Sequence, residues 1–412
     1  MDKIVIKKRK LTIKTFFWVS IFLFFFVLCC DGTNSQMINV SILSVVMSIM
    51  LLLLKGGSSC LRKIFTPANL WCAIFLLLAA LSCIQSINVQ ASMSITVVML
   101  KKLIVIFSIF IFIENKEDWE LLIKLYMFSC LLMMVKITYY ALRGYSGIDM
   151  WDIACGNYFN SVAQFLAISI MFAVYFFMNY KSTRWINVFY ILFSFYHIFL
   201  TGSRKGLLMP VVGIAIYIVL ESGNKAKKHM RNIGIIVLAV VVILFVFARN
   251  PELEERFTQL FVGLFVNDQQ QDVSTMMRQS FISIAMNMFR EKPIWGYGVG
   301  TFATVAQSTI GRYVYSHNNF TEILSGMGVI GFVGYYWYYI YLAIKLYCMK
   351  KKHNVYMICL SILLTLTVFE YGIVTYSIYI YPVILSILSI PLTESYSKSL
   401  ITSTDCKDSA CK

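Results

Sequence analysis

Charged residues are scarce in this sequence. Of its 412 residues, 14% are charged and 59% are hydrophobic, whereas an average soluble domain carries roughly 25% charged residues. Apolar runs close to the ~20 residues that cross a bilayer core recur along the chain. Strict alternation of polar and apolar residues is also missing from runs such as 233–246, which excludes the strands of a membrane β-barrel. The composition therefore predicts an all-α polytopic membrane protein.

The sequence also lacks the motifs of several enzyme classes. It contains no HExxH, no Asp-x-Asp and no clustered Cys and His, so we expect no metal held by protein ligands. It has no GxSxG nucleophile elbow, and the run at 202–205 lacks the spacing of a P-loop. The glycine cluster at 296–300 lacks the spacing and the preceding strand of a dinucleotide-binding fingerprint. We accordingly expect no cofactor.

Lysine and arginine alternate between the loops, with few exceptions. The first apolar run has a basic start but no small-residue cleavage site after it, so we expect an uncleaved span. With the N-terminus in the cytoplasm, basic loops such as 225–231 fall inside, and loops such as 31–36, without Lys or Arg, fall outside. Both termini are then expected in the cytoplasm. The twelve predicted spans lie near 14–31, 37–54, 69–86, 95–113, 119–142, 160–179, 185–200, 205–221, 233–248, 319–345, 355–370 and 373–392.

This topology divides the chain into four parts. Residues 1–248 hold the first nine spans, 249–318 form an extracytoplasmic lid loop, 319–392 hold the last three spans, and 393–412 are a cytoplasmic tail. Apolar residues recur at helical spacing over 253–265 and again over 277–288. We therefore expect two short amphipathic helices in the loop, the second capped by Ser274 or Thr275.

Lys101 and Lys102 fall within the predicted fourth span. Lysines near the ends of a span commonly extend along the helix until the ammonium group reaches the lipid headgroups. The alternative is that one of the two lines an anion-binding cavity inside the bundle. The sequence leaves both interpretations open.

Polar side chains gather just before the tenth predicted span. His317 precedes Asn318, and Glu322 lies five residues after the histidine, where its carboxylate could orient the imidazole. A histidine base near neutral pH suits removal of a proton from a sugar hydroxyl. A lone histidine is more often structural, so it is these neighbours that favour a catalytic site.

Two arginines are predicted on the same outer face as this histidine. Arg204 lies in a tight turn at 201–206, and Arg278 opens the second loop helix. Arginine at a membrane surface often only contacts lipid headgroups, but its planar fork also suits phosphate bidentately. Few acidic residues lie nearby, so the pair would suit a pyrophosphate. The neighbours that we expect to bind substrate are Lys205, Tyr297, Asn318 and Glu322.

Taken together, these motifs resemble the O-antigen ligase and polymerase superfamily of bacterial envelopes. The resemblance consists of an arginine at 278, Pro-x-x-Gly-x-Gly-x-Gly-x-Phe at 293–302, His-Asn-x-Phe-x-Glu at 317–322 and Gly-x-x-Gly at 328–331. The Thr-Gly-Ser-Arg turn at 201–204 is similar to that family as well. The resemblance covers about 200–340; the remainder agrees only in its number of spans.

The resemblance implies a GT-C-like membrane glycosyltransferase that uses polyprenyl-diphosphate-linked glycans without a metal. It places the active site on the extracytoplasmic face of the bacterial plasma (inner) membrane. Carried over residue by residue, the family's turn arginine matches Arg204, its loop arginine Arg278 and its histidine His317, which gives three expected catalytic residues.

A polymerase of lipid-linked repeat units, for O-antigen or capsule, is the favoured activity. The alternative is a ligase that transfers the glycan to lipid A core or another envelope acceptor, and a different class is a transporter of such glycans. Expected partners are an undecaprenyl-diphosphate-linked oligosaccharide, an acceptor glycan, the bilayer, and a flippase and chain-length regulator of the same pathway. The net charge of +16 is scattered between apolar runs, so no nucleic-acid partner is expected.

Overall fold

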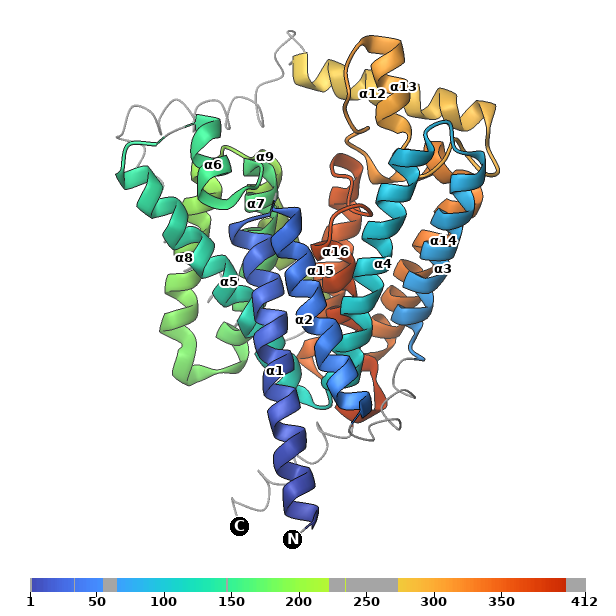
Figure 1. The fold of residues 1–412 in the computed structure, drawn as a ribbon. Helices are drawn as coiled ribbons and strands as arrows, with labels where there is room; N and C mark the ends of the chain where they lie inside the picture. The colour runs from blue at the N-terminus through green and yellow to red at the C-terminus, as the bar shows by residue number, and fades with distance from the viewer. Residues whose placement is uncertain are drawn as a thin grey trace.

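The computed structural model describes residues 2–32, 34–54, 65–145, 147–221, 234 and 273–397, and this part of the chain is entirely helical and irregular, without strands. Figure 1 shows the helices side by side, with the start of the chain at the opposite end from α12. The long helices are α1 (Asp2–Cys30), α2 (Ser35–Leu54), α3 (Pro67–Ser82), α4 (Val89–Phe112), α5 (Lys116–Leu142), α7 (Phe159–Asn179), α8 (Arg184–Thr201), α9 (Arg204–Leu220), α12 (Val273–Glu291), α14 (Asn319–Met349) and α15 (Asn354–Phe369). Shorter ones are α6 (Gly147–Cys155), α13 (Phe302–Ile310), α16 (Ile380–Ser389) and the 3-10 turns η2 (Cys83–Gln85), η3 (Lys181–Thr183), η4 (Glu370–Gly372) and η5 (Ile390–Leu392).

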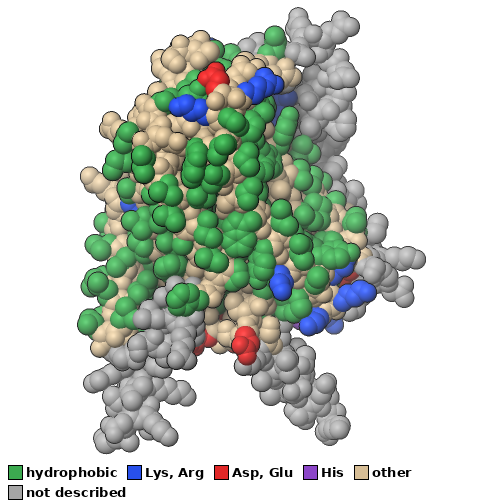
Figure 2. Space-filling model, turned by 90° about the vertical axis from the view of Figure 1, so that its right-hand side faces the viewer, with side chains coloured by type: hydrophobic (Ala, Val, Ile, Leu, Met, Phe, Trp, Pro, Cys, Tyr) green, Lys and Arg blue, Asp and Glu red, His purple; other side chains and the backbone are tan. Residues whose placement is uncertain are grey.

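Eight of the described helices are long and apolar enough to cross a membrane: α1 to α5, α7, α14 and α15. Figure 2 shows the corresponding surface, a broad hydrophobic band with Lys and Arg gathered toward its two ends. A helix satisfies its own backbone hydrogen bonds, which is what a lipid environment requires. The all-helical polytopic membrane fold expected from the composition is thereby confirmed.

The predicted spans and the observed helices agree closely along most of the chain. The helices α8 and α9 fall on the predicted runs 185–200 and 205–221. The predicted span at 233–248 and the first loop helix at 253–265 lie outside the described residues. The count of twelve spans therefore stays a prediction. The short helices α6 and α13 were not expected from the sequence.

The centre of the bundle is α7. This mostly apolar helix of 21 residues is 89% buried, and it packs against both α8 and α9. A helix that is apolar over most of its surface is buried inside a bundle, so α7 forms an inner wall against which α8 and α9 pack.

The last predicted span, 373–392, is helical only from Ile380. Ahead of it, the side-chain oxygen Oδ1 of Asn319 accepts hydrogen bonds from the backbone N–H of Thr375 (2.8 Å) and Tyr376 (3.1 Å). The ammonium of Lys102 donates to the carbonyl of Tyr376 at 2.5 Å. Irregular backbone inside a membrane bundle needs such partners. Lys102 is fully buried, so it braces this segment and does not extend to a membrane surface.

The helix α14 is broken near its start. Gly328 has φ 63° and ψ −162°, far from helical values, and it interrupts the hydrogen-bonding pattern. The backbone N–H of Val329 donates to the carbonyl of Pro293 at 2.8 Å. The chain that follows α12 is therefore bound into the break in α14.

The glycines at 296–300 allow this close approach. The N–H of Gly298 donates to the carbonyl of Gly326 at 2.7 Å. Gly296 has φ 68°, and a Cβ added there would lie 2.4 Å from the carbonyl carbon of Gly326. Backbone meets backbone at this point, which requires residues without side chains. The glycine motif thus couples the position of α12 to that of α14.

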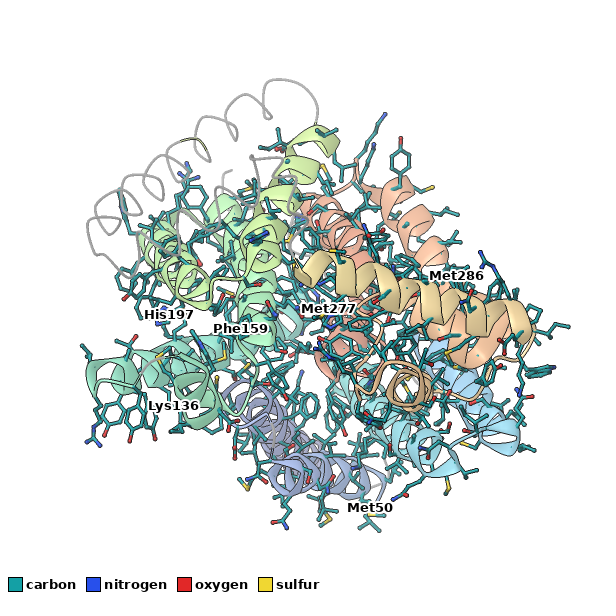
Figure 3. The ribbon with its side chains drawn as sticks, turned by 90° about the horizontal axis from the view of Figure 1, so that it is seen from above. Met50, Lys136, Phe159, His197, Met277 and Met286 are labelled. Carbon is teal, nitrogen blue, oxygen red and sulfur yellow. The ribbon has the colours of Figure 1, made fainter. Side chains whose placement is uncertain are left out.

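The helix α12 lies across one end of the bundle, as Figures 1 and 3 show. It buries Phe281, Ala285 and Met288, the face expected from their spacing. This face packs on Phe302 and Ala306 of α13 in a small separate core. This packing positions α12, whose Arg278 lines a cavity at this end of the bundle.

Candidate active site

The corner between α8 and α9 carries Arg204. Gly202 ends α8 in the left-handed conformation, with φ 65°, which glycine adopts without strain. Ser203 then caps α9, because its hydroxyl accepts a hydrogen bond from the N–H of Gly206 at 3.3 Å. Arg204 is consequently the first residue of α9 and is exposed. The partial positive charge of a helix N-terminus adds to that of its guanidinium.

His317 lies in a strained turn immediately before α14. Its φ is 59°, and it is the one non-glycine residue with positive φ in the described part of the chain. The buried carboxylate of Glu322 accepts the backbone N–H of Ser316 at 2.6 Å. Oδ1 of Asn318 caps α14 by accepting the N–H of Phe320 at 2.9 Å. Strained backbone persists where its surroundings determine it and commonly marks a functional site.

The His317 ring is flanked by two aromatic rings. Its centroid lies 4.1 Å from that of Tyr315 and 5.8 Å from that of Phe281, with which it is stacked. Phe281 belongs to α12, three residues after Arg278. The histidine and the arginine are thereby positioned by the same packing contact.

A cavity of about 260 Å³ brings the predicted catalytic residues together. Arg204, Arg278 and His317 all line it, together with Lys205. Among the described residues that line it, none is acidic. The other lining residues are Phe159, Asn160, Gln164, Gly202, Ser203, Tyr315, Gly372 and Ile373. Phe159, at the start of α7, and Arg278, on α12, both line this cavity; Figure 3 labels Phe159 and Met277, the neighbour of Arg278 in the chain.

The electrostatics of the cavity keep the histidine neutral. Burial, then the positive charges of Arg278 and Lys205, lower the pKa of His317 from 6.5 to about 4. Each of these factors disfavours the imidazolium form. At physiological pH the imidazole therefore has a free lone pair, and it can accept a proton. The surrounding cations make the cavity suited to an anion.

Lys205 is tied to the opposite wall of the cavity. Its ammonium donates a hydrogen bond to the carbonyl of Gly372. The preceding Glu370 is fully buried and accepts hydrogen bonds from the phenols of Tyr336 (2.8 Å) and Tyr339 (2.6 Å). This network links α14 and the turn η4, so it holds the Gly372 carbonyl where Lys205 reaches it.

Three of the residues expected to bind substrate do not line the cavity. Asn318 and Glu322 are engaged with backbone in the His317 turn, as described above. The phenol of Tyr297 donates to the carboxylate of Glu291, on the far part of α12. Contact of these three side chains with a substrate stays a prediction, whereas Lys205 does face the cavity.

Several residues that line the cavity were not expected from the sequence. Asn160 and Gln164 interrupt the apolar run of α7 at a spacing of four, which places them on one helix face. That pattern was a usable signal. Gly372 offers only a backbone carbonyl, and its position depends on tertiary packing, so it had no signal in the sequence.

The described residues that line the cavity form no obvious set of metal ligands. Among the described residues, no three His, Cys, Asp or Glu side chains are grouped so that they could hold an ion. Lys102 is not among the described residues that line this cavity. The expectation that the protein works without metal or cofactor stays a prediction.

Comparison with known proteins gives two findings. Residues 189–336 match the model of a domain family described as O-antigen ligase. The chain is also 29% identical over 199 residues to the teichuronic acid biosynthesis protein TuaE of Bacillus subtilis (strain 168). That alignment covers 46% of this chain and 39% of the Bacillus protein. The family match spans Arg204, Arg278 and His317.

Proposed function

Because the chain carries an O-antigen ligase family domain, we propose that it is a membrane glycosyltransferase that polymerises polyprenyl-diphosphate-linked repeat units into a surface polysaccharide. The observation that carries the proposal is the cavity in which two arginines, a lysine and a neutral histidine meet, with no acidic side chain among the described residues that line it. The relative's printed name, a teichuronic acid biosynthesis protein, supports a role in polysaccharide assembly.

The cationic wall binds the diphosphate of the donor. Arg204 and Arg278 present planar forks that match phosphate oxygens bidentately. The N-terminus of α9, which begins at Arg204, adds a partial positive charge that favours an anion. The polyprenyl chain then extends along the apolar flanks of the bundle, and the glycan faces the space beneath α12.

The reaction transfers the growing glycan from its lipid diphosphate to an acceptor hydroxyl. The hydroxyl oxygen attacks the anomeric carbon, the bond from that carbon to the diphosphate oxygen breaks, and the configuration inverts. The hydroxyl proton passes to the imidazole of His317. The negative charge that develops on the leaving diphosphate is stabilised by Arg204 and Arg278, so the chemistry needs no metal ion.

Donor binding also activates the base. After burial, the positive charges of Arg278 and Lys205 lower the pKa of His317, and a bound diphosphate offsets these charges. The pKa of the imidazole then rises toward its ordinary value, and a base with a pKa closer to the working pH accepts a proton more effectively. The histidine is therefore most basic when the donor is present.

The proposed topology completes twelve spans. To the eight helices named above it adds α8, α9, the run at 233–248 and the last segment around α16. Both termini and the tail at 393–412 are then cytoplasmic. The loop at 249–318 and the cavity lie on the extracytoplasmic face of the bacterial plasma membrane, between the spans of 1–248 and those of 319–392.

A ligase is the second candidate within the same chemistry. It would use the same donor and transfer the glycan to lipid A core or another envelope acceptor. The polymerase is favoured because a second lipid-linked unit has the same diphosphate and needs no separate protein or lipid A surface. A transporter would move the lipid-linked glycan without breaking a glycosidic bond.

Purified protein in liposomes that contain lipid-linked repeat units tests the proposal. A polymerase lengthens the glycan on the lipid without any other acceptor. Arg278→Gln should slow this on the order of 100- to 1,000-fold, whereas Arg290→Gln, at an exposed position of the same helix, should not. A product that forms only after a different acceptor is added identifies a ligase. Movement of intact repeat units across the bilayer without longer glycans would contradict the glycosyltransferase.

A further inference from the structure

Two amide side chains form a neutral wall of the cavity. Asn160 and Gln164 lie four residues apart on α7, so they share one face of that helix, and both line the cavity. Neither is charged, in contrast to the arginines and lysine that line the same space. Their chemistry therefore differs from that of the rest of the site.

Gln164 is held in one orientation. It is 5% exposed, and its carbonyl oxygen Oε1 accepts the phenol proton of Tyr381 at 2.5 Å. Tyr381, in α16, is itself 1% exposed. With the oxygen engaged, the amide NH2 is the group left to face the cavity, and none of the described residues hydrogen-bonds it. Gln164 lines the open space of the cavity, so a hydrogen-bond acceptor on a ligand there can pair with this NH2 group.

The amide wall lies directly beside the cationic wall. Ala163, the neighbour of Gln164, packs against Gly206 of α9, where an added Cβ would lie 2.4 Å from the Cβ of Ala163. Gly206 follows Lys205 in the chain. The first turn of α9 and the Gln164 amide are therefore at the same level of the bundle, and one ligand can touch both.

We propose that Asn160 and Gln164 recognise the hydroxyl groups of the sugar attached to the diphosphate, so that α7 selects the glycan while the cations bind the lipid diphosphate. The inference rests on the proposed function. A sugar hydroxyl both donates and accepts, as an amide does, whereas Arg and Lys only donate. A site that hydrogen-bonds a substrate hydroxyl also discriminates strongly against analogues that lack it.

The test compares two kinds of lipid in detergent binding assays with the full chain. The sugar-free probe is undecaprenyl diphosphate. The sugar-bearing probes are undecaprenyl diphosphates that carry glucose, galactose or an N-acetylhexosamine. We expect the protein to bind at least one sugar-bearing lipid more tightly than the sugar-free lipid; this difference is the gain in affinity from the sugar. Gln164→Met should bind that sugar-bearing lipid about tenfold more weakly than the wild type does, which is the effect of one or two lost hydrogen bonds. Its affinity for the sugar-free lipid should stay at the wild-type value.

Three variants separate sugar recognition from a bracing role of Gln164. Asn160→Ala should lose part of the same gain, and because Asn160 is exposed it should fold normally. Ser161→Ala, on a neighbouring face, should lose nothing. Tyr381→Phe removes only the brace and should reduce the gain less than Gln164→Met does.

The outcomes distinguish this inference from the proposed function. If no sugar-bearing lipid binds more tightly, or if Gln164→Met and Asn160→Ala keep the full gain, the amides do not recognise sugar even though the diphosphate binds. Equal weakening of both lipid types by Gln164→Met would likewise overturn the inference, since that result describes a brace between α7 and α16. Failure of the wild-type protein to bind any diphosphate lipid would instead contradict the proposed function.

Discussion

The substitution Arg278→Gln separates two effects of one positive charge. The Arg278 side chain is half-buried in α12 and lines the cavity beside His317. Glutamine keeps much of the length and some hydrogen-bonding capacity but has no charge. We expect a loss of transition-state stabilisation at the diphosphate and, at the same time, a change in the basicity of the histidine.

The two expected changes have different magnitudes and directions. Removal of one preorganised electrostatic donor typically lowers kcat on the order of 100- to 1,000-fold. The pKa of His317 should rise, because Arg278 is the second largest cause, after burial, of its fall to about 4. Burial persists in the variant, so the pKa should remain below its ordinary value of 6.5. The acid limb of kcat/KM, which reports the free enzyme, should move to higher pH.

The assay follows radiolabelled lipid-linked repeat units through a pH series, with enough sensitivity for the slow variant. Arg278→Lys is the matched control, because it keeps the charge and loses only the planar fork. It should leave the acid limb near its wild-type position while still lowering kcat. Lys205→Met should move the acid limb in the same direction as Arg278→Gln, by less, since Lys205 is the smaller of the two charge effects.

Two results would refute this reasoning. An Arg278→Gln protein that folds and transfers glycan at the wild-type rate would remove the arginine from the mechanism. A large fall in kcat with an unchanged acid limb in both charge-removing variants would show that His317 is not the group that titrates.

Three further predictions follow from individual contacts. Gly296→Ala should lower the thermal midpoint much more than Gly311→Ala. Both glycines have positive φ, but an added Cβ at Gly296 would meet the backbone of Gly326, whereas the space around Gly311 is open. Equal shifts of the midpoint in a melting experiment would contradict the role of Gly296 in packing the 296–300 segment against α14. Glu322→Leu should reduce kcat by about tenfold or more. Glu322→Gln should reduce it far less, because the amide oxygen can still accept the hydrogen bond from the Ser316 N–H. An equal loss in both variants would show that the carboxylate charge, and not this hydrogen bond, is required. Transfer by the wild-type protein should continue in excess EDTA, and its arrest, with recovery on addition of a divalent cation, would contradict the metal-free mechanism.

The helical membrane fold could be predicted from the sequence because it depends on local properties. A run of apolar residues forms a helix in lipid regardless of its distant neighbours, since its backbone hydrogen bonds are internal. The Arg204 corner is also local, because Gly202 and Ser203 end one helix and cap the next. The buried face of α12 followed from its spacing. These features therefore matched the expectations closely.

The cavity could not be predicted in the same way, because it forms where helix faces from distant parts of the chain pack together. Lys205 contacts the carbonyl of Gly372, 167 residues away, and no local pattern specifies that pairing. The same holds for Lys102, which the sequence left between two interpretations and the packing placed on the Tyr376 carbonyl. Candidate catalytic residues could be predicted from residue types in the sequence, but only the packing of the helices decided which side chains line one cavity. Hydropathy is a property of each segment, whereas contact is a property of pairs.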